Sequence, residues 1–200
     1  ICVIVDNSFE TIAFYLACMF CGVVVVPINE NNYEIQLSYI YKDSKSKGIF
    51  FSKHEIFKSI TIDSEFKILI SEFINVSKKL NKNYIPFFNF DENQELLIIY
   101  TSGTTSKPKG VIHSYKSIFN SANLFSKNIN FPKDCCIPTL LPMSYLGGYF
   151  NLFLIPYINK SSIIILEPFN AKMALGFWDI VEKYNINTLW LVPTMIAMLI

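Results

Sequence analysis

Short apolar runs alternate with amphipathic stretches along most of this 200-residue chain. Residues 1–5 and 48–51 are rich in β-branched or aromatic side chains, which is typical of buried strands. Residues 9–21 suit a helix, with Asn7 or Ser8 as its N-cap and Gly22 at its end. Because strands and helices continue to alternate in this way, the pattern predicts an α/β fold of layered sheets with packing helices.

The remaining predicted elements follow the same order. Strands are expected at residues 23–26, 67–70, 96–100, 110–113, 136–141 and 162–166. Helices are expected at residues 34–41, 115–127 (capped by Ser114), 171–184 and 194–200. Residues 75–93 are polar and predicted to be rich in loops. Since neither an internal repeat nor a clear domain boundary is visible, we expect one partial domain over residues 1–200.

The most distinctive segment is the polar sequence YTSGTTSKPKG at residues 100–110, which follows an apolar run. Its hydroxyl and backbone N–H groups can bind anionic oxygens, Gly103 permits close backbone approach, and Lys107 or Lys109 can supply positive charge. A Walker loop is not matched, because Lys109 precedes the second glycine and Pro108 lies inside the segment. A solvated Ser/Thr/Lys linker is the alternative interpretation. The order of residues favours a polyphosphate site.

This segment resembles the phosphate-loop signature of the adenylate-forming enzymes: acyl-CoA synthetases, peptide synthetase adenylation domains and firefly luciferase. The usual form is Y/F-T-S-G-T/S-T-G-x-P-K-G, and this chain departs from it only at Ser106, where glycine is usual. Residues 16–29, 141–148 and 188–194 are also similar to family segments, in the family's order. The resemblance implies part of the large N-terminal domain of such an enzyme. We expect truncation at both ends, because the chain opens within a predicted strand and stops within a predicted helix.

The resemblance implies ATP-dependent activation of a carboxylic acid to an acyl-adenylate, with release of pyrophosphate and then transfer of the acyl group to a thiol. Coenzyme A is the expected acceptor, a carrier-protein thiol is the alternative, and Mg²⁺ would neutralise phosphate oxygens. Two other interpretations remain, an amino-acid-adenylating domain of a peptide synthetase and a truncated, non-catalytic nucleotide-binding remnant. Peptide synthetases usually carry a Phe-Asp-x-Ser-type motif where this chain has residues 142–145, so an acyl-CoA synthetase is favoured.

By the same resemblance, the ATP phosphates would be bound by loop residues Thr101, Ser102, Gly103, Thr104, Thr105 and Lys109. Tyr145 stands where relatives often have histidine, and it would contact the acyl group or the nucleotide; a core aromatic role is the alternative. The family motifs that contact adenine, ribose and metal would follow Ile200, as would the catalytic lysine. No catalytic or metal-binding residue is therefore assigned, and we expect the isolated chain to be inactive.

Charge and composition limit the kinds of binding partner and the cellular location that we expect. The formal net charge of +1 gives no electrostatic reason to expect nucleic acid or an anionic membrane. Residues 11–29 and 135–159 are long enough to cross a bilayer, but their glycines and prolines favour strands, loops and helices. The five cysteines suit a reducing cytoplasm, and Cys18 and Cys21 are expected to be buried and structural. His113 is also expected to have a structural role. We therefore expect a cytoplasmic enzyme without a membrane span.

Overall fold

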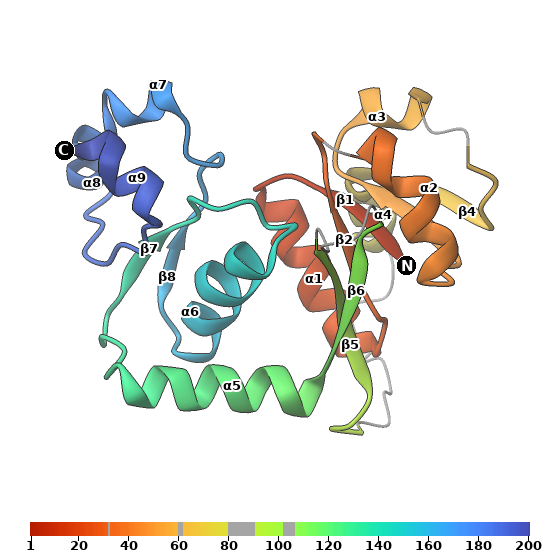
Figure 1. The fold of residues 1–200 in the computed structure, drawn as a ribbon, viewed down its shortest axis with the longest axis horizontal. Coiled ribbons are helices and arrows are strands. Elements are labelled where there is room, and N and C mark those ends of the chain that lie inside the picture. The colour runs from red at the N-terminus through yellow and green to blue at the C-terminus, as the bar shows by residue number, and fades with distance from the viewer. Residues whose placement is uncertain (32, 60–61, 80–90, 102–106) are drawn as a thin grey trace. The chain divides into compact units, whose positions relative to one another are not determined.

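The computed structural model describes residues 1–31, 33–59, 62–79, 91–101 and 107–200. The chain forms two compact units, Ile1–Ile118 and Phe119–Ile200. The division between them lies inside helix α5 (Tyr115–Asn128). Figure 1 shows the elements of both units.

The first unit is built on a parallel four-stranded sheet with the strand order β2-β1-β3-β4. Its strands are β1 (Cys2–Val5), β2 (Val26–Asn29), β3 (Gly48–Phe51) and β4 (Phe66–Leu69). Its helices are α1 (Phe9–Cys21), α2 (Tyr33–Asp43), α3 (His54–Ser59) and α4 (Ile70–Ser77). The unit also contains an antiparallel hairpin of β5 (Glu95–Thr101) and β6 (Lys109–Ser114).

Helices pack against both faces of the parallel sheet. Since successive residues of a strand point to opposite sides, each strand contributes side chains to both of these packed faces. On one face, Ile4 of β1 belongs to a buried cluster that includes Leu37 of α2. On the other face, Phe50 of β3 packs against Phe14 of α1, with ring centroids 4.5 Å apart, and both rings contact Phe73 of α4. The sheet is therefore buried on both sides, as is usual for parallel strands.

The ends of α1 follow from local chemistry. The Ser8 hydroxyl accepts a hydrogen bond from the backbone N–H of Thr11 at 3.1 Å and caps the first turn. Gly22 ends the helix with φ of 67°, a left-handed conformation that glycine adopts without steric cost. The Val23 N–H then bonds back to a carbonyl of the last helical turn at 2.9 Å. Val23 belongs to this turn and Val25 forms an isolated bridge with Leu97, so the strand predicted at residues 23–26 begins only at Val26, as β2.

The second unit contains a short parallel pair of strands, β7 (Cys136–Pro138) and β8 (Ser162–Ile164). The segment between these strands includes a π-helix, η1 (Gly147–Leu154), and α6 (Ile155–Ile158). Helices α7 (Ala171–Ala174), α8 (Phe177–Lys183) and α9 (Pro193–Leu199) follow. Two clusters of buried side chains, one that includes Ile137 and one that includes Phe177, form its core.

The structure confirms the predicted α/β class but changes several elements. Strand β3 occupies the predicted residues, and the Ser114 hydroxyl caps α5 by accepting a hydrogen bond from the Ser117 N–H at 3.1 Å. The single helix predicted at residues 171–184 is interrupted at Leu175 and Gly176, which separate α7 from α8. Helices α3 and α4 were not predicted, and α4 extends into the segment that we expected to be rich in loops.

The two uncharged stretches form the predicted kinds of element. Residues 11–29 run through α1 into β2, and residues 135–159 contain β7, η1 and α6. Within the described part of the chain, no helix combines the length and the apolar character that a bilayer crossing requires.

Candidate phosphate-binding site

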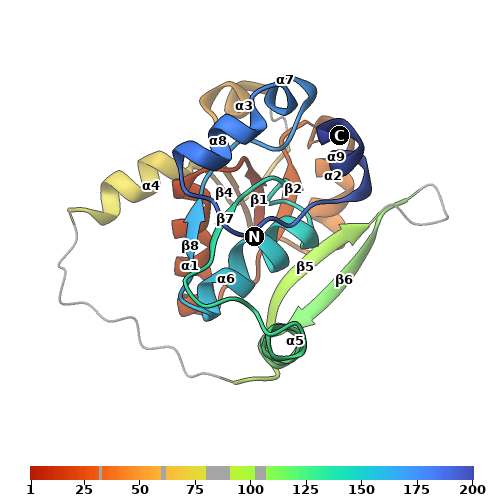
Figure 2. The same cartoon turned by 90° about the vertical axis from the view of Figure 1, so that its left-hand side faces the viewer.

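The base of the expected phosphate loop is formed by the two strands of hairpin β5–β6, which lie side by side in Figure 2. Thr101, the last residue of β5, pairs with Lys109, the first residue of β6. Both residues are exposed. The antiparallel register therefore brings one predicted hydroxyl ligand and the predicted lysine ligand together.

The other predicted phosphate ligands, Ser102, Gly103, Thr104 and Thr105, lie outside the described residues, as does the unusual Ser106. Their assignment rests on the sequence motif and stays a prediction. The described residues Lys107 and Pro108 precede β6 and complete the base of the loop on that side.

Strand β5 is attached to the core of the first unit. The Val25 N–H donates to the Leu96 carbonyl at 3.0 Å, and the Ile98 N–H donates to the Val25 carbonyl at 2.9 Å. Leu96 and Leu97 are fully buried, whereas Thr101 is exposed. The strand is thus anchored in the core through Leu96 and Leu97, and its last residue, Thr101, is exposed to solvent.

Two lysine ammonium groups stand at this exposed end of the hairpin. Lys107 and Lys109 are exposed, and neither forms an ion pair with the described acidic residues. The Lys107 Nζ lies 5.7 Å from the centroid of the Tyr39 ring, which belongs to α2. Both positive charges are therefore available to an anion, and phosphate oxygens are suitable acceptors for lysine N–H groups.

A contact that the sequence analysis missed lies beside these lysines. The Tyr100 hydroxyl donates a hydrogen bond to Oδ2 of Asp43, the last residue of α2, at 2.6 Å. Burial, and then the hydrogen bond to Asp43, raise the pKa of Tyr100 above its usual range. The two residues are 57 positions apart and Asp43 belongs to no recognised motif, so no local sequence signal could have revealed the pair.

Tyr145 belongs to the second unit and lies just before η1. Its side chain is 44% exposed, which contradicts the alternative of a core aromatic role. The predicted contact with an acyl group or nucleotide stays a prediction.

Three other titratable side chains of the first unit, His113, Tyr115 and Cys18, are buried or half-buried. His113 on β6 is half-buried, and burial lowers its pKa. Tyr115 is buried, its hydroxyl donates to the Met19 carbonyl at 2.5 Å, and burial raises its pKa to about 12. Cys18 is buried as expected, and burial raises its pKa to about 12, which keeps the thiol protonated. Cys21, the last residue of α1, is exposed, contrary to expectation.

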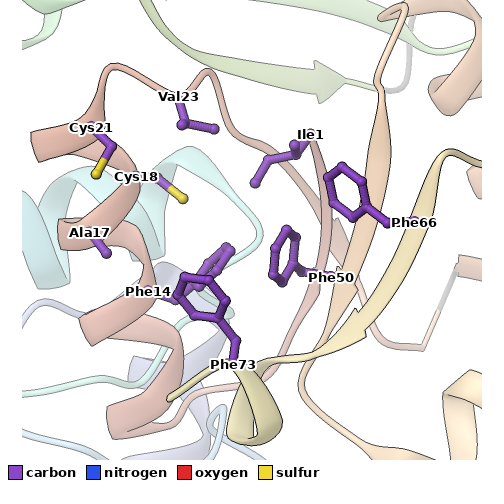
Figure 3. A pocket seen from close by; sticks show the side chains of 9 residues that line it. All are labelled: Ile1, Phe14, Ala17, Cys18, Cys21, Val23, Phe50, Phe66 and Phe73. Carbon is purple, nitrogen blue, oxygen red and sulfur yellow. The ribbon is translucent and has the colours of Figure 1, made fainter. Parts of the chain in front are cut away.

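The first unit also contains an apolar pocket of about 250 Å³ between α1, the sheet and α4, which Figure 3 shows. It is lined by Ile1, Phe14, Ala17, Cys18, Cys21, Val23, Phe50, Phe66 and Phe73. Hydrocarbon and thiol side chains offer no good donors to phosphate, so this pocket is not the polyphosphate site. Among the described residues, no group of three His, Cys, Asp or Glu side chains gathers as a metal site would require.

Comparison with known proteins identifies the class. A model of the AMP-binding enzyme family matches residues 1–200. The chain therefore belongs to the AMP-binding enzymes.

Three curated relatives are similar over most of this chain. It is 26% identical to oxalate–CoA ligase from Saccharomyces cerevisiae, with 94% of this chain and 40% of the relative covered. It is 28% identical to malonate–CoA ligase from Arabidopsis thaliana, with 92% and 32% covered. It is 24% identical to gramicidin S synthase 1 from Brevibacillus brevis, with 98% and 18% covered. The chain thus spans less than half the length of these relatives.

Solved structures share the fold. The inhibitor-bound N-terminal domain of FACL13 from Mycobacterium tuberculosis matches with a TM-score of 0.87 at 20% identity, covering 99% of this chain and 50% of that one. The o-succinylbenzoate–coenzyme A synthetase from Bacillus subtilis, in complex with ATP and magnesium ion, matches with a TM-score of 0.75 at 19% identity, covering 98% and 51%. The α/β architecture is therefore that of the N-terminal domain of adenylate-forming enzymes.

Proposed function

We propose that the protein carrying this chain uses ATP to convert a carboxylic acid to an acyl-adenylate, releasing pyrophosphate, and then transfers the acyl group to a thiol. Coenzyme A is the proposed acceptor. The chain's own contribution is the phosphate-binding loop. The observation that carries the proposal is the hairpin, which places Thr101 and Lys109 of the family signature side by side and exposed.

The chemistry of adenylation fits such a hairpin. A carboxylate oxygen attacks the α-phosphorus of ATP, the bond to the bridging oxygen breaks, and pyrophosphate leaves with its negative charge. A loop that binds the β- and γ-phosphates orients this leaving group and stabilises the charge that develops on it. Thr101 would donate a hydroxyl hydrogen bond, and Lys109 would supply an ammonium group.

Magnesium would accompany the nucleotide in this proposal. The described residues contain no acidic cluster for a resident ion, so the phosphates themselves are the expected ligands from this part of the protein. Bound to ATP, Mg²⁺ would reduce the negative charge that the two lysines must balance.

The relatives' names support a CoA ligase, because oxalate–CoA ligase and malonate–CoA ligase are both acid–CoA ligases. Gramicidin S synthase 1 supports the runner-up, an amino-acid-adenylating domain with a carrier-protein thiol as acceptor. The identities of 24–28% do not select an acid. We also propose a cytoplasmic location, because all five cysteines are free thiols, as is usual in a reducing compartment.

The test is carboxylate-dependent ATP–pyrophosphate exchange by the intact protein, with separate panels of carboxylic acids and amino acids. Exchange with a carboxylic acid, followed by acyl-CoA formation when coenzyme A is added, is the expected result. Exchange with amino acids alone would favour the peptide synthetase alternative. No exchange with any acid, in a folded protein that still binds ATP, would favour a non-catalytic nucleotide-binding remnant. The isolated chain of 200 residues is expected to give no exchange.

A further inference from the structure

Asp43 connects helix α2 to the base of the phosphate loop. Its Oδ2 accepts the hydrogen bond from the Tyr100 hydroxyl at 2.6 Å, and Tyr100 directly precedes Thr101. We propose that Asp43 is a positioning residue that acts through Tyr100 to hold the loop base in the geometry that binds the β- and γ-phosphates of ATP. This proposal rests on the function proposed above.

The opposite strand leaves room for the Tyr100 ring. Tyr100 pairs with Gly110 of β6, and a Cβ atom on Gly110 would lie 3.0 Å from Cζ of Tyr100. The same Cβ would lie 3.0 Å from Cγ2 of Ile98. Because Gly110 has no side chain, the ring can lie over the hairpin backbone while its hydroxyl reaches α2.

The same face of α2 also contacts Lys107, which follows the loop in the sequence. Tyr39 lies one turn before Asp43, so the two side chains share this face. The Tyr39 hydroxyl reaches Oδ1 of Asp43 at 3.4 Å, and the Tyr39 and Tyr100 rings pack edge to face with centroids 6.5 Å apart. Lys107, on the other side of the loop, lies over the Tyr39 ring. Residues before and after the loop thus meet one helical surface.

Helix α2 can serve as a rigid support because it is fixed to the parallel sheet. Leu37 and Ile40 of α2 are buried in the cluster that covers one sheet face, and Tyr39 and Tyr100 pack against that cluster. A binding loop is most precise when packed neighbours and hydrogen bonds limit its movement. Asp43 would therefore act on the phosphates indirectly, since its carboxylate is negatively charged and is itself no phosphate ligand.

The experiment compares ATP with AMP, which lacks the β- and γ-phosphates. Dissociation constants for both nucleotides are measured by calorimetry on the intact protein and on Asp43→Asn, Tyr100→Phe and the double variant. Tyr41→Phe is the matched tyrosine control, because it removes a hydroxyl of the same helix that donates to the Lys47 carbonyl at 2.9 Å. Asp63→Asn, at an exposed position of the same unit, is the charge control.

Tyr100→Phe removes the donor and should weaken ATP binding about fivefold, a size typical of one net hydrogen bond. Asp43→Asn keeps an amide oxygen as a neutral, weaker acceptor, so its loss of ATP affinity should be smaller but in the same direction. The double variant should lose no more than Tyr100→Phe alone, because the two residues act through a shared contact. AMP binding should stay within about twofold of the wild type, and both controls should bind ATP normally.

Equal losses for ATP and AMP would overturn the proposal, since a merely structural role would affect both nucleotides. ATP binding equal to the controls would also overturn it, while leaving the proposed function intact. A wild-type protein that binds neither nucleotide would reject the proposed function and the positioning role together. If Asp43→Asn does not fold, Tyr100→Phe decides alone, because it keeps the ring that packs against the sheet cluster.

Discussion

Strand β1 of the parallel sheet and strand β6 of the hairpin, both in the first unit, use burial in opposite ways. Every residue of β1 is at most 3% exposed, whereas the first four residues of β6 are all exposed, including apolar Val111 and Ile112. The sheet therefore gains its stability from side chains packed on both faces. Strand β6 gives up that burial, and it holds the Lys109 side chain in solvent, where a ligand can reach it. Under the proposed function, stability and phosphate binding thus belong to different strands of one unit.

The largest expected effect is the loss of a sheet side chain. Phe50→Ala should lower the free energy of unfolding by about 3–5 kcal/mol, because Phe50 is buried against Phe14, Phe66 and Phe73. Urea denaturation of the intact protein measures the change. Phe9→Ala is the control, since Phe9 is 69% exposed and its loss should cost less than about 0.5 kcal/mol. Similar costs at both positions would remove the proposed contrast between buried and exposed regions.

A smaller effect tests the turn that delivers the chain from α1 to β2. Gly22→Ala should cost about 1 kcal/mol of unfolding free energy, because a residue with a Cβ is strained at φ of 67°. Gly22→Asn is the matched variant, and it should cost less because asparagine tolerates this conformation. If the wild type, Gly22→Ala and Gly22→Asn are equally stable in urea denaturation, a side chain at position 22 causes no strain and the prediction is wrong.

The smallest expected effect concerns pH and the hairpin. Burial lowers the pKa of His113 from its ordinary value of 6.5, so the folded state favours the neutral ring. The unfolded chain then binds more protons near that pH, and stability should fall as pH is lowered through this range. His113→Gln should lose less stability than the wild type between about pH 7.5 and 5.5. The free energy of unfolding of both proteins is measured by denaturation at each pH. If it falls equally in the wild type and in His113→Gln, His113 makes no contribution to the pH dependence.

Much of the fold could be predicted because its signals are local. Ser8 caps α1, Gly22 ends it, and the apolar run of β3 lies where the sequence placed it. The valine run after Gly22 misled the prediction of β2, because strand boundaries depend on pairing as well as on β-branched side chains. Val26 is the first residue that pairs with β1, opposite Cys2.

The candidate site was predictable only where a motif marked it. The signature gave Thr101 and Lys109, and the hairpin register adds that they are neighbours across the strands. Asp43 and Tyr39 could not be found in this way, because their contacts with Tyr100 and Lys107 exist only in the folded chain. Residues that bind a ligand leave a pattern in the sequence, whereas residues that position them often do not.

The most direct test of the central claim is Lys109→Ala in the intact protein, assayed by carboxylate-dependent ATP–pyrophosphate exchange and by urea denaturation. Lys172→Ala, an exposed lysine in α7, is the control. We predict that exchange at low ATP falls at least about tenfold for Lys109→Ala, as expected for a lost charged hydrogen bond, while its unfolding midpoint matches the wild type. Unchanged exchange kinetics, or a loss of exchange accompanied by an equal loss of stability, would contradict the assignment of phosphate binding to the hairpin.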